Sequence, residues 1–337
     1  MANKRIDYID WLKGLSIICV VWFHSPHPEW LNFSFRMPLF FLLSGIFFKI
    51  VPFRTYAARK TNQLLVPFFV FYVIYYFYMM LEYRISPTHE GVDFDPYIFF
   101  DLFAPHDGKT GFFVNTPLWF IAALINLQIM LHVLVRSLPR RWMVMAAAVF
   151  LSLAGYYWML PHESYFMFGR SLQYLGYYTF GHLYGKSLLQ VVEKSGRHRS
   201  MLTAASVAVM AATFIIATGK DHPWQFPAAY LFNIALVMSL IVLFRYVSRV
   251  RVLRFFHFYG RNSYVVLGMH YMVVQMFYVA FAMTDTPFTF ISGICVMTVT
   301  LLLMAPMIRL GNCYCPKLIG REEAINFSTL RRRLSLR

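Results

Sequence analysis

Ten long runs of apolar residues limit what this chain can fold into more than any other feature of its sequence. Each run is bounded by charged residues, Pro or Gly, and together they cover about residues 11–30, 37–53, 64–83, 117–135, 142–160, 171–191, 201–218, 226–247, 263–283 and 287–310. A helix of about twenty apolar residues is long enough to cross the hydrocarbon core of a bilayer. The sequence therefore predicts an all-α fold, a polytopic integral membrane protein with about ten transmembrane helices.

The composition agrees with a membrane protein and excludes an ordinary soluble domain. Of the 337 residues, 59% are hydrophobic and only 14% are charged, and the mean hydropathy is +0.53. Soluble chains carry about a quarter charged residues. The first apolar run follows Asp7 and Asp10 and lacks a small-residue cleavage site, so we expect no cleavable signal peptide and a first helix that stays in the membrane.

Basic residues are distributed unevenly between the two sides that ten spans would create. One side collects 26 of the 31 Lys and Arg residues. The other side holds only Arg36, Arg84, Lys109, Arg170 and Lys220. Cytoplasmic loops carry such an excess, so both termini are predicted to be cytoplasmic, in a multi-pass protein of the cell inner (plasma) membrane. A positive face against anionic lipid accounts for the net charge of +16, and no nucleic acid partner is expected.

Two segments lie outside the apolar runs. The loop of about residues 84–116 is acidic and aromatic, which fits a lid that binds sugars by stacking and by accepting hydroxyl hydrogen bonds; an interfacial loop with an aromatic belt has the same composition. The segment 316–337 ends in "STLRRRLSLR" and is expected to lie on anionic lipid or to be disordered. We therefore divide the chain into a single transmembrane domain, residues 1–315, and a basic cytoplasmic tail, residues 316–337.

The four cysteines suggest neither a disulfide nor a metal site. Cys19 and Cys295 lie within apolar runs, where small buried residues are usual. Cys313 and Cys315 fall at the cytoplasmic end of the last run, in a compartment where disulfides are rare. Without His or further Cys partners, these two make a poor zinc site, so no metal is expected.

A histidine at membrane depth is the most informative polar residue. His24 closes the first apolar run eleven residues after Lys13, about 16 Å along a helix. At 100° per residue, His24 lies about 20° from Lys13 and about 40° from Asp10 around the axis, so the three residues share one stripe. Polar side chains at such depth tend to mark a pathway or a site, although a ring bonded to a neighbouring helix is the alternative. Asp10 is about 21 Å from His24, too far to bond it, and instead suits a local pair with Lys13.

Several stretches together resemble one family, the family-3 membrane acyltransferases. "RIDYIDWLKG" followed by "VVWFH" resembles the family's first span, and "FRMPLFFLLSGIFFK" is similar to the second-span motif of its fucose 4-O-acetylase-like branch. "TPLWFIAALI", with Trp119, resembles the fourth span. "YGRNSYVVLGMH", with Asn262, Ser263 and His270, resembles a late Gly-Lys/Arg-x-Ser segment that is followed by a histidine. The similarity covers nearly the whole chain in the expected order.

Three positions depart from the family's pattern. Arg36 stands where the branch often has a histidine before Met-Pro, and Lys13 stands where the first span has an arginine. "RKTNQLLVP" keeps Arg59 and Lys60, but Asn62 and Gln63 stand where a second basic residue would fall. The role of that second arginine must be filled otherwise or not at all.

The resemblance implies transfer of an acyl group, usually acetyl from acetyl-CoA, to a hydroxyl of a cell-surface glycan or lipid-linked sugar. Such transfer needs a base for the hydroxyl proton and a donor for the developing oxyanion, and a neutral imidazole suits the first task. We expect His24 to be the catalytic base, oriented by a group on another span, for which Ser44 and His270 are candidates. His270 is also the competing candidate for the base, and its alternative role is that of a packed core histidine. Arg36 is expected to bind an acidic sugar or the partner of His24, with contact to lipid headgroups as the alternative.

The donor is expected to be held from the cytoplasmic side by basic residues. Acetyl-CoA, or another acyl-CoA, is a donor substrate, and no permanently bound cofactor is predicted. Its phosphates suit charge-assisted bonds, for which the candidates are Lys13, Arg54, Arg59 and Lys60. Positive-inside topology alone would also place basic residues on this face.

Two other classes of function stay open at this stage. A transporter or flippase of a lipid-linked sugar or oligosaccharide would also use ten spans, polar stripes and an aromatic loop, but it would need no CoA. A non-catalytic scaffold in glycan assembly is the third class. The acceptor sugar, the acyl group and the oligomeric state cannot be read from the sequence.

Overall fold

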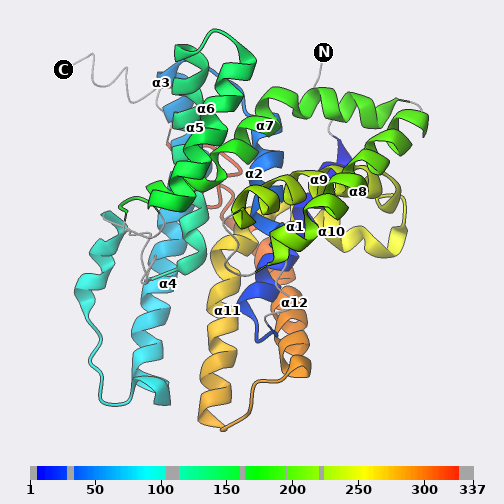
Figure 1. The fold of residues 1–337 in the computed structure, drawn as a ribbon. Helices are drawn as coiled ribbons and strands as arrows, with labels where there is room; N and C mark the ends of the chain where they lie inside the picture. Colours follow the sequence, from blue (N-terminus) through cyan, green and yellow to red (C-terminus); the bar gives the residue numbers. More distant parts are fainter. Residues whose placement is uncertain are drawn as a thin grey trace, which may run out of the picture.

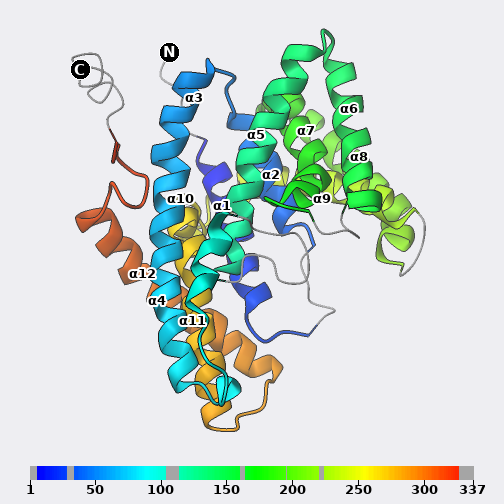
Figure 2. The ribbon, with the colours of Figure 1, turned by 90° about the vertical axis from the view of Figure 1, so that its left-hand side faces the viewer.

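The protein is helical throughout the part that the structure describes, and this confirms the all-α prediction. The computed structural model describes residues 6–28, 34–103, 114–159, 164–194, 196–219 and 224–325, and no strand occurs within these ranges. The helices are α1 Asp7–His24, α2 Arg36–Phe47, α3 Phe53–Lys60, α4 Val66–Ile85, α5 Trp119–Ser137, α6 Arg141–Ala154, α7 Phe168–Glu193, α8 Gly196–Thr218, α9 Gln225–Val247, α10 Arg254–Arg261, α11 Ser263–Met283 and α12 Phe290–Tyr314. The π-helical turn η2, Thr61–Leu65, joins α3 to α4 in one continuous helical segment (Figure 2).

Each of the ten predicted spans contains one of these helices. Seven helical segments in the described ranges are long and apolar enough to cross a membrane: Phe53–Ile85, Thr116–Ser137, Arg141–Met159, Gly196–Thr218, Gln225–Val247, Ser263–Met283 and Phe290–Tyr314. The other three predicted spans correspond to α1, which carries three charged residues, to α2, which has only 12 residues, and to the more polar α7. The chain is thus a polytopic membrane protein, while the count of ten and the cytoplasmic termini stay predictions. Lys4, Lys109, Lys220 and the arginines 331–333, used in the charge count, lie outside the described residues.

Helix α1 occupies the middle of the molecule. It packs against α2, α9, α10, α11 and α12. The two perpendicular views of Figures 1 and 2 both show α1 between other helices. Its side chains are buried accordingly: Leu12, Ile17 and Val21 are fully inaccessible. A functional group on α1 is therefore positioned by several neighbouring helices at once.

Two motif glycines allow α1 to touch α10. A Cβ atom on Gly14 would clash with the backbone carbonyl of Phe256, and one on Gly260 would clash with the carbonyl of Asp10. Glycine is therefore required for the same reason in the Lys-Gly pair of the first span and in "YGRNS": at this helix crossing the two backbones are in contact and leave no space for a side chain. Helices α2 and α7 cross in a similar way at Gly45.

The relative directions of α1, α11 and α12 define two ends of the bundle. At one end, the rings of Trp22 and Phe290 lie 6.0 Å apart, so the end of α1 meets the start of α12. At the other, the side chain of Asn312 near the end of α12 donates a 3.0 Å hydrogen bond to Asn262, just before α11. We call these the His24 end and the α10 end. Helices α1 and α11 run parallel and α12 runs opposite, so the start of α1 and the end of α12 lie at the same end, as an even number of spans requires.

The two segments outside the apolar runs pack against the bundle where the structure describes them. In the loop, the hydroxyl of Tyr72 on α4 donates to the carbonyls of Ile98 and Phe99, and residues 104–113 lie outside the described residues. From the predicted tail, residues 316–325 fold back onto η2, and residues 326–337 are not described. The described part of the aromatic loop is thus held to α4 by hydrogen bonds from a tyrosine side chain to the loop backbone.

Candidate active site

Two imidazole rings meet inside the His24 end of the bundle. The ring centres of His24 on α1 and His270 on α11 lie 5.3 Å apart at an angle of 55°. His24 is partly exposed, whereas the side chain of His270 is fully buried. The two histidines that the sequence places within separate apolar runs are therefore neighbours.

The hydrogen bonds of His270 fix its tautomer. Its Nδ1 lies 2.7 Å from the carbonyl oxygen of Val266 and 3.1 Å from that of Leu267. Because a carbonyl can only accept, Nδ1 carries the proton and donates it, and in the neutral ring Nε2 has the lone pair. That Nε2 is buried and has no hydrogen-bond partner among the described residues. A buried acceptor without a partner is costly, and such groups occur where a catalytic role, a bound donor or an ordered water compensates.

Aromatic rings of α11 and α4 close one side of the pair. Tyr271 makes an edge contact with His24, with ring centres 5.0 Å apart, and stacks on Tyr75 at 5.6 Å. The Tyr271 hydroxyl accepts a 2.9 Å hydrogen bond from Gln275. One turn further, the hydroxyl of Tyr278 donates to the backbone carbonyl of His24 at 3.3 Å. These contacts hold the end of α1 against α11.

Arg36 extends towards the same cluster from α2. Its guanidinium lies 3.7 Å from the ring centre of Phe23, which itself makes an edge contact with His24. The backbone oxygen of Arg36 accepts a 2.6 Å hydrogen bond from Ser16 of α1. A cation is thus separated from the His24 ring by the single ring of Phe23.

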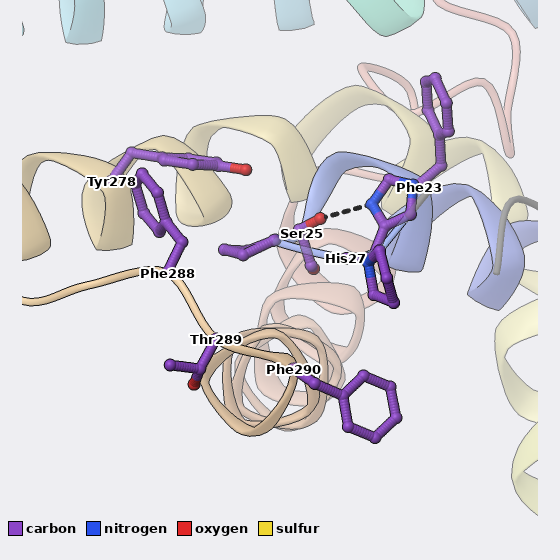
Figure 3. A pocket seen from close by; sticks show the side chains of 9 residues that line it. Phe23, Ser25, His27, Tyr278, Phe288, Thr289 and Phe290 are labelled. Atoms are coloured by element: carbon purple, nitrogen blue, oxygen red, sulfur yellow. Dashed lines mark hydrogen bonds between the residues drawn. The ribbon is translucent and has the colours of Figure 1, made fainter. Parts of the chain in front are cut away.

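A pocket opens next to His24 at this end of the bundle (Figure 3). It encloses about 480 Å³ and is lined by Phe23, Ser25, Pro26, His27, Pro28, Tyr278, Phe288, Thr289 and Phe290. Figure 3 shows Tyr278 and Phe288 on one side of the pocket and His27 and Phe23 on the other. Nδ1 of His27 lies 2.8 Å from the carbonyl of Ser25 and donates to it, which fixes this ring as well. We call this space the His24-end pocket.

The predicted donor residues lie away from this pocket. Nζ of Lys13 is 3.9 Å from Oδ1 of Asp10, so the structure contains the local ion pair expected from their spacing. The same Nζ lies over the Phe47 ring. Arg54 and Arg59 are exposed on α3, and Lys60 is partly exposed there.

The other predicted site residues are scattered. Trp119 begins α5 and lies against Phe41 and below Arg170, whose guanidinium is 5.3 Å from its ring centre. Ser44 is partly exposed on α2, and within the described residues no contact joins it to the histidine pair. Asn262 and Ser263 form the junction of α10 and α11, at the opposite end of the bundle from His24.

A basic pocket at the α10 end was missed by the sequence interpretation. It encloses about 520 Å³ and is lined by Arg254, His257, Phe258, Arg261, Asn262, Asn312, Pro316, Arg321 and Glu322. Arg254, His257 and Arg261 are spaced by three and four residues, which places them on one face of a helix. That spacing was a usable signal, hidden because α10 has only eight residues and is too short to be a span. We call this space the α10-end pocket.

No candidate metal centre accompanies these sites in the ranges that the structure covers. No three side chains of His, Cys, Asp or Glu there come together in a way that could hold an ion. Cys19, Cys295, Cys313 and Cys315 all have free thiols.

The fold and the site together define a membrane protein with an imidazole pair inside its bundle and a pocket at the same end, lined by the neighbours Phe23 and Ser25 of His24. A family model described as an acyltransferase domain, that of acyltransferase family 3, matches residues 6–307. The chain therefore belongs to this family, and membership implies that it is a membrane acyltransferase. The match does not distinguish branches within the family. No curated protein and no solved structure gives a significant match.

Proposed function

We propose that the protein moves an acetyl group from acetyl-CoA to a hydroxyl of a cell-surface glycan or lipid-linked sugar, with His24 as general base. The observation that carries this proposal is the pair of imidazoles 5.3 Å apart, one partly exposed and one fully buried. His270 has a fixed tautomer and an unpartnered Nε2, so it is suited to accept the N–H of His24 after a small ring rotation. His24 would then present the lone pair of its other nitrogen to the substrate.

The reaction on this pair balances without further groups. The acceptor hydroxyl gives its proton to His24 as its oxygen bonds to the thioester carbon. The tetrahedral intermediate places negative charge on the former carbonyl oxygen, and Arg36, which lies over the ring of Phe23 next to His24, would stabilise that charge. The C–S bond then breaks, and the proton passes from His24 to the sulfur, which leaves as CoA thiol.

The His24-end pocket is suited to the acceptor. Its rings offer faces on which sugars stack, and His27 and Thr289 add polar groups. Its volume of about 480 Å³ lies in the range of small-molecule sites. Arg36 also borders a second space, of about 360 Å³, together with Gln173 and Asn233, which offers room for an acidic substituent of the sugar.

The opposite end of α1 is suited to the donor. The ring of Trp11 lies 6.4 Å from that of His257 in the α10-end pocket, and thirteen residues separate Trp11 from His24. These thirteen residues span about 20 Å along α1. The pantetheine arm of CoA, comparable to about five extended residues, reaches about 17 Å. The two lengths differ by about 3 Å, so a donor anchored at the α10 end would bring its thioester nearly to the level of His24 along α1.

The experiment that tests this function uses purified full-length protein and membranes from cells that lack the gene. Transfer of a radiolabelled acetyl group from acetyl-CoA to those membranes, with release of CoA thiol, is the expected result. Deletion of the gene should correspondingly lower the O-acetyl content of surface glycans in mass spectrometry. A transporter or flippase would not need acetyl-CoA. If calorimetry shows no binding of acetyl-CoA at millimolar concentration, the proposal is contradicted and the transporter is favoured.

A further inference from the structure

The C-terminal arm, which we define as residues 316–325, is fastened to the membrane domain by one buried amide. Asn62 of η2 is only 5% exposed. Its Oδ1 accepts from the backbone N–H groups of Ala324 at 2.9 Å and Ile325 at 2.8 Å, and its Nδ2 donates to the carbonyl of Ile325 at 2.9 Å. Asn62 thereby pairs with the arm as a neighbouring strand would. Such complete satisfaction of a buried side chain indicates a fixed position for the arm.

The arm places Arg321 at the junction of α10 and α11. Nη2 of Arg321 donates to the carbonyl of Arg261 at 2.8 Å and to Oδ1 of Asn262 at 2.5 Å. Its Nε donates to Oδ1 of Asn312 at 3.2 Å, and Asn312 in turn donates to Asn262. The guanidinium is thus held by groups from two segments that are far apart in the sequence, the junction 261–262 and the end of α12. A preorganised cation costs little further ordering when a ligand arrives.

These contacts put three arginines around one hollow. Arg254, Arg261 and Arg321 line the α10-end pocket together with His257, and Glu322 is the acidic residue in the lining. The positive-inside tendency explains basic residues on a face, but it does not explain an amide that fastens one of them in place. Guanidinium groups bind phosphate oxygens in pairs, and the pocket of about 520 Å³ has room for a phosphorylated nucleotide.

We propose that the C-terminal arm is part of the donor site, and that Arg321 binds the phosphate groups of the CoA nucleotide in the α10-end pocket. This inference rests on the proposed function, since it names where that donor is anchored. It extends the site to a segment beyond residue 307, where the match to the family model ends. The same phosphate chemistry could come from an anionic lipid headgroup, and we commit to the nucleotide because the distance from the pocket to His24 along α1 is close to the length of one pantetheine arm.

The test measures binding of adenosine 3′,5′-bisphosphate and of acetyl-CoA to full-length protein in nanodiscs of phosphatidylcholine. Arg321→Gln should weaken binding of both probes by about 10–100-fold, the usual cost of a charge-assisted hydrogen bond. Lys317→Gln is the matched control, because it removes the same charge from an exposed position of the same arm, outside the pocket lining. Asn62→Ala offers a second variant, since it unfastens the arm without touching the pocket; it should weaken both probes as well.

Each result distinguishes this inference from the proposed function. Wild-type affinity for both probes in Arg321→Gln and Asn62→Ala would overturn the role of the arm, while acetyl transfer by the same proteins would leave the function intact. Failure of the wild-type protein to bind acetyl-CoA would overturn both. Repeating the titration in phosphatidylglycerol nanodiscs tests whether an anionic headgroup occupies the pocket. If Arg321→Gln leaves the affinity for both probes in phosphatidylcholine unchanged and alters only the affinity measured in phosphatidylglycerol, the pocket binds headgroups and the inference is wrong.

Discussion

At the scale of single residues, the site depends on which nitrogen of each imidazole carries a proton. His270 is not free to choose, because the carbonyls of its own helix hold the Nδ1 proton. Its Nε2 is left as a buried acceptor without a partner in the described part of the chain. The centre of its ring lies 5.3 Å from the centre of the His24 ring. The pair therefore resembles a base with its orienting group, in which an imidazole takes the place of a carboxylate.

The orienting role that we propose for His270 predicts a difference between two substitutions. His270→Ala removes the acceptor, and we expect kcat to fall by about 100-fold, the cost of a misplaced catalytic group, with an unchanged KM for acetyl-CoA. In His270→Gln the side-chain oxygen can lie near the position of Nε2, so activity should recover in part. Steady-state kinetics of both variants provide the measurement. Equal loss in both, together with a lower unfolding temperature, would identify His270 as a packing residue instead.

The basic residues of α3 provide a second prediction at this scale. Arg59 lies one helical turn before Asn62, next to the attached C-terminal arm. Arg59→Ala and Lys60→Ala should each weaken acetyl-CoA binding by about 1–3 kcal/mol in calorimetry. Arg141→Ala, at the exposed start of α6, should change it little. If all three variants lose affinity equally, the basic face attracts the donor without a local site.

At the scale of elements, the crossing of α1 and α10 fixes the α10 end of the proposed reaction path. Gly14→Ala or Gly260→Ala would force these backbones apart, and overpacking of this kind costs about 1–3 kcal/mol or more. Gly311→Ala on α12 is the control, because its added methyl group would meet only side-chain atoms of Ile319 at 3.6 Å or more. The unfolding temperature in detergent should fall for the first two variants and not for the third. Equal temperatures for Gly14→Ala and Gly311→Ala would show that the crossing is looser than described.

The helices that could be predicted from the sequence are those with a long apolar run. Each of the ten runs contains a helix, and seven of the described helical segments are long and apolar enough to cross a membrane, which are properties that the sequence states directly. The amphipathic α10 has eight residues and no such signal, so its basic pocket went unnoticed. The two histidines could be singled out from the sequence because each interrupts an apolar run. That they lie side by side depends on how α1 and α11 pack, which no local sequence pattern predicts. The attachment of the arm to Asn62 joins residues 263 positions apart, and the composition of the tail favours only a basic, solvated segment.

At the scale of the whole molecule, the account requires a donor and an acceptor that reach His24 from opposite ends. The start of α1 and the end of α12 lie at the α10 end, and the excess of basic residues predicts that this end faces the cytoplasm. The His24-end pocket would then open to the other side, where glycans are assembled or displayed. The direction of the acetyl group through the protein follows from this orientation.

Cysteine labelling tests the orientation directly. Cys295, Cys313 and Cys315 are exposed, so the experiment should start from a variant in which all four cysteines are replaced. Asp101→Cys should react with an impermeant maleimide in intact cells, whereas Lys317→Cys should react only after permeabilisation. The reverse pattern would overturn the predicted topology and with it the cytoplasmic donor site.

The central claim is that His24 is the general base, and acetyl transfer by His24→Ala tests it most directly. General base catalysis contributes about 10²–10⁴-fold, so the variant should lose transfer to membrane acceptors by that order. Expression and acetyl-CoA binding should stay close to wild type, and His132→Ala, a histidine of α5 outside the site, should retain full activity. Normal transfer by a well-folded His24→Ala protein would contradict the account, and loss of donor binding in that variant would make His24 a binding residue instead of the base.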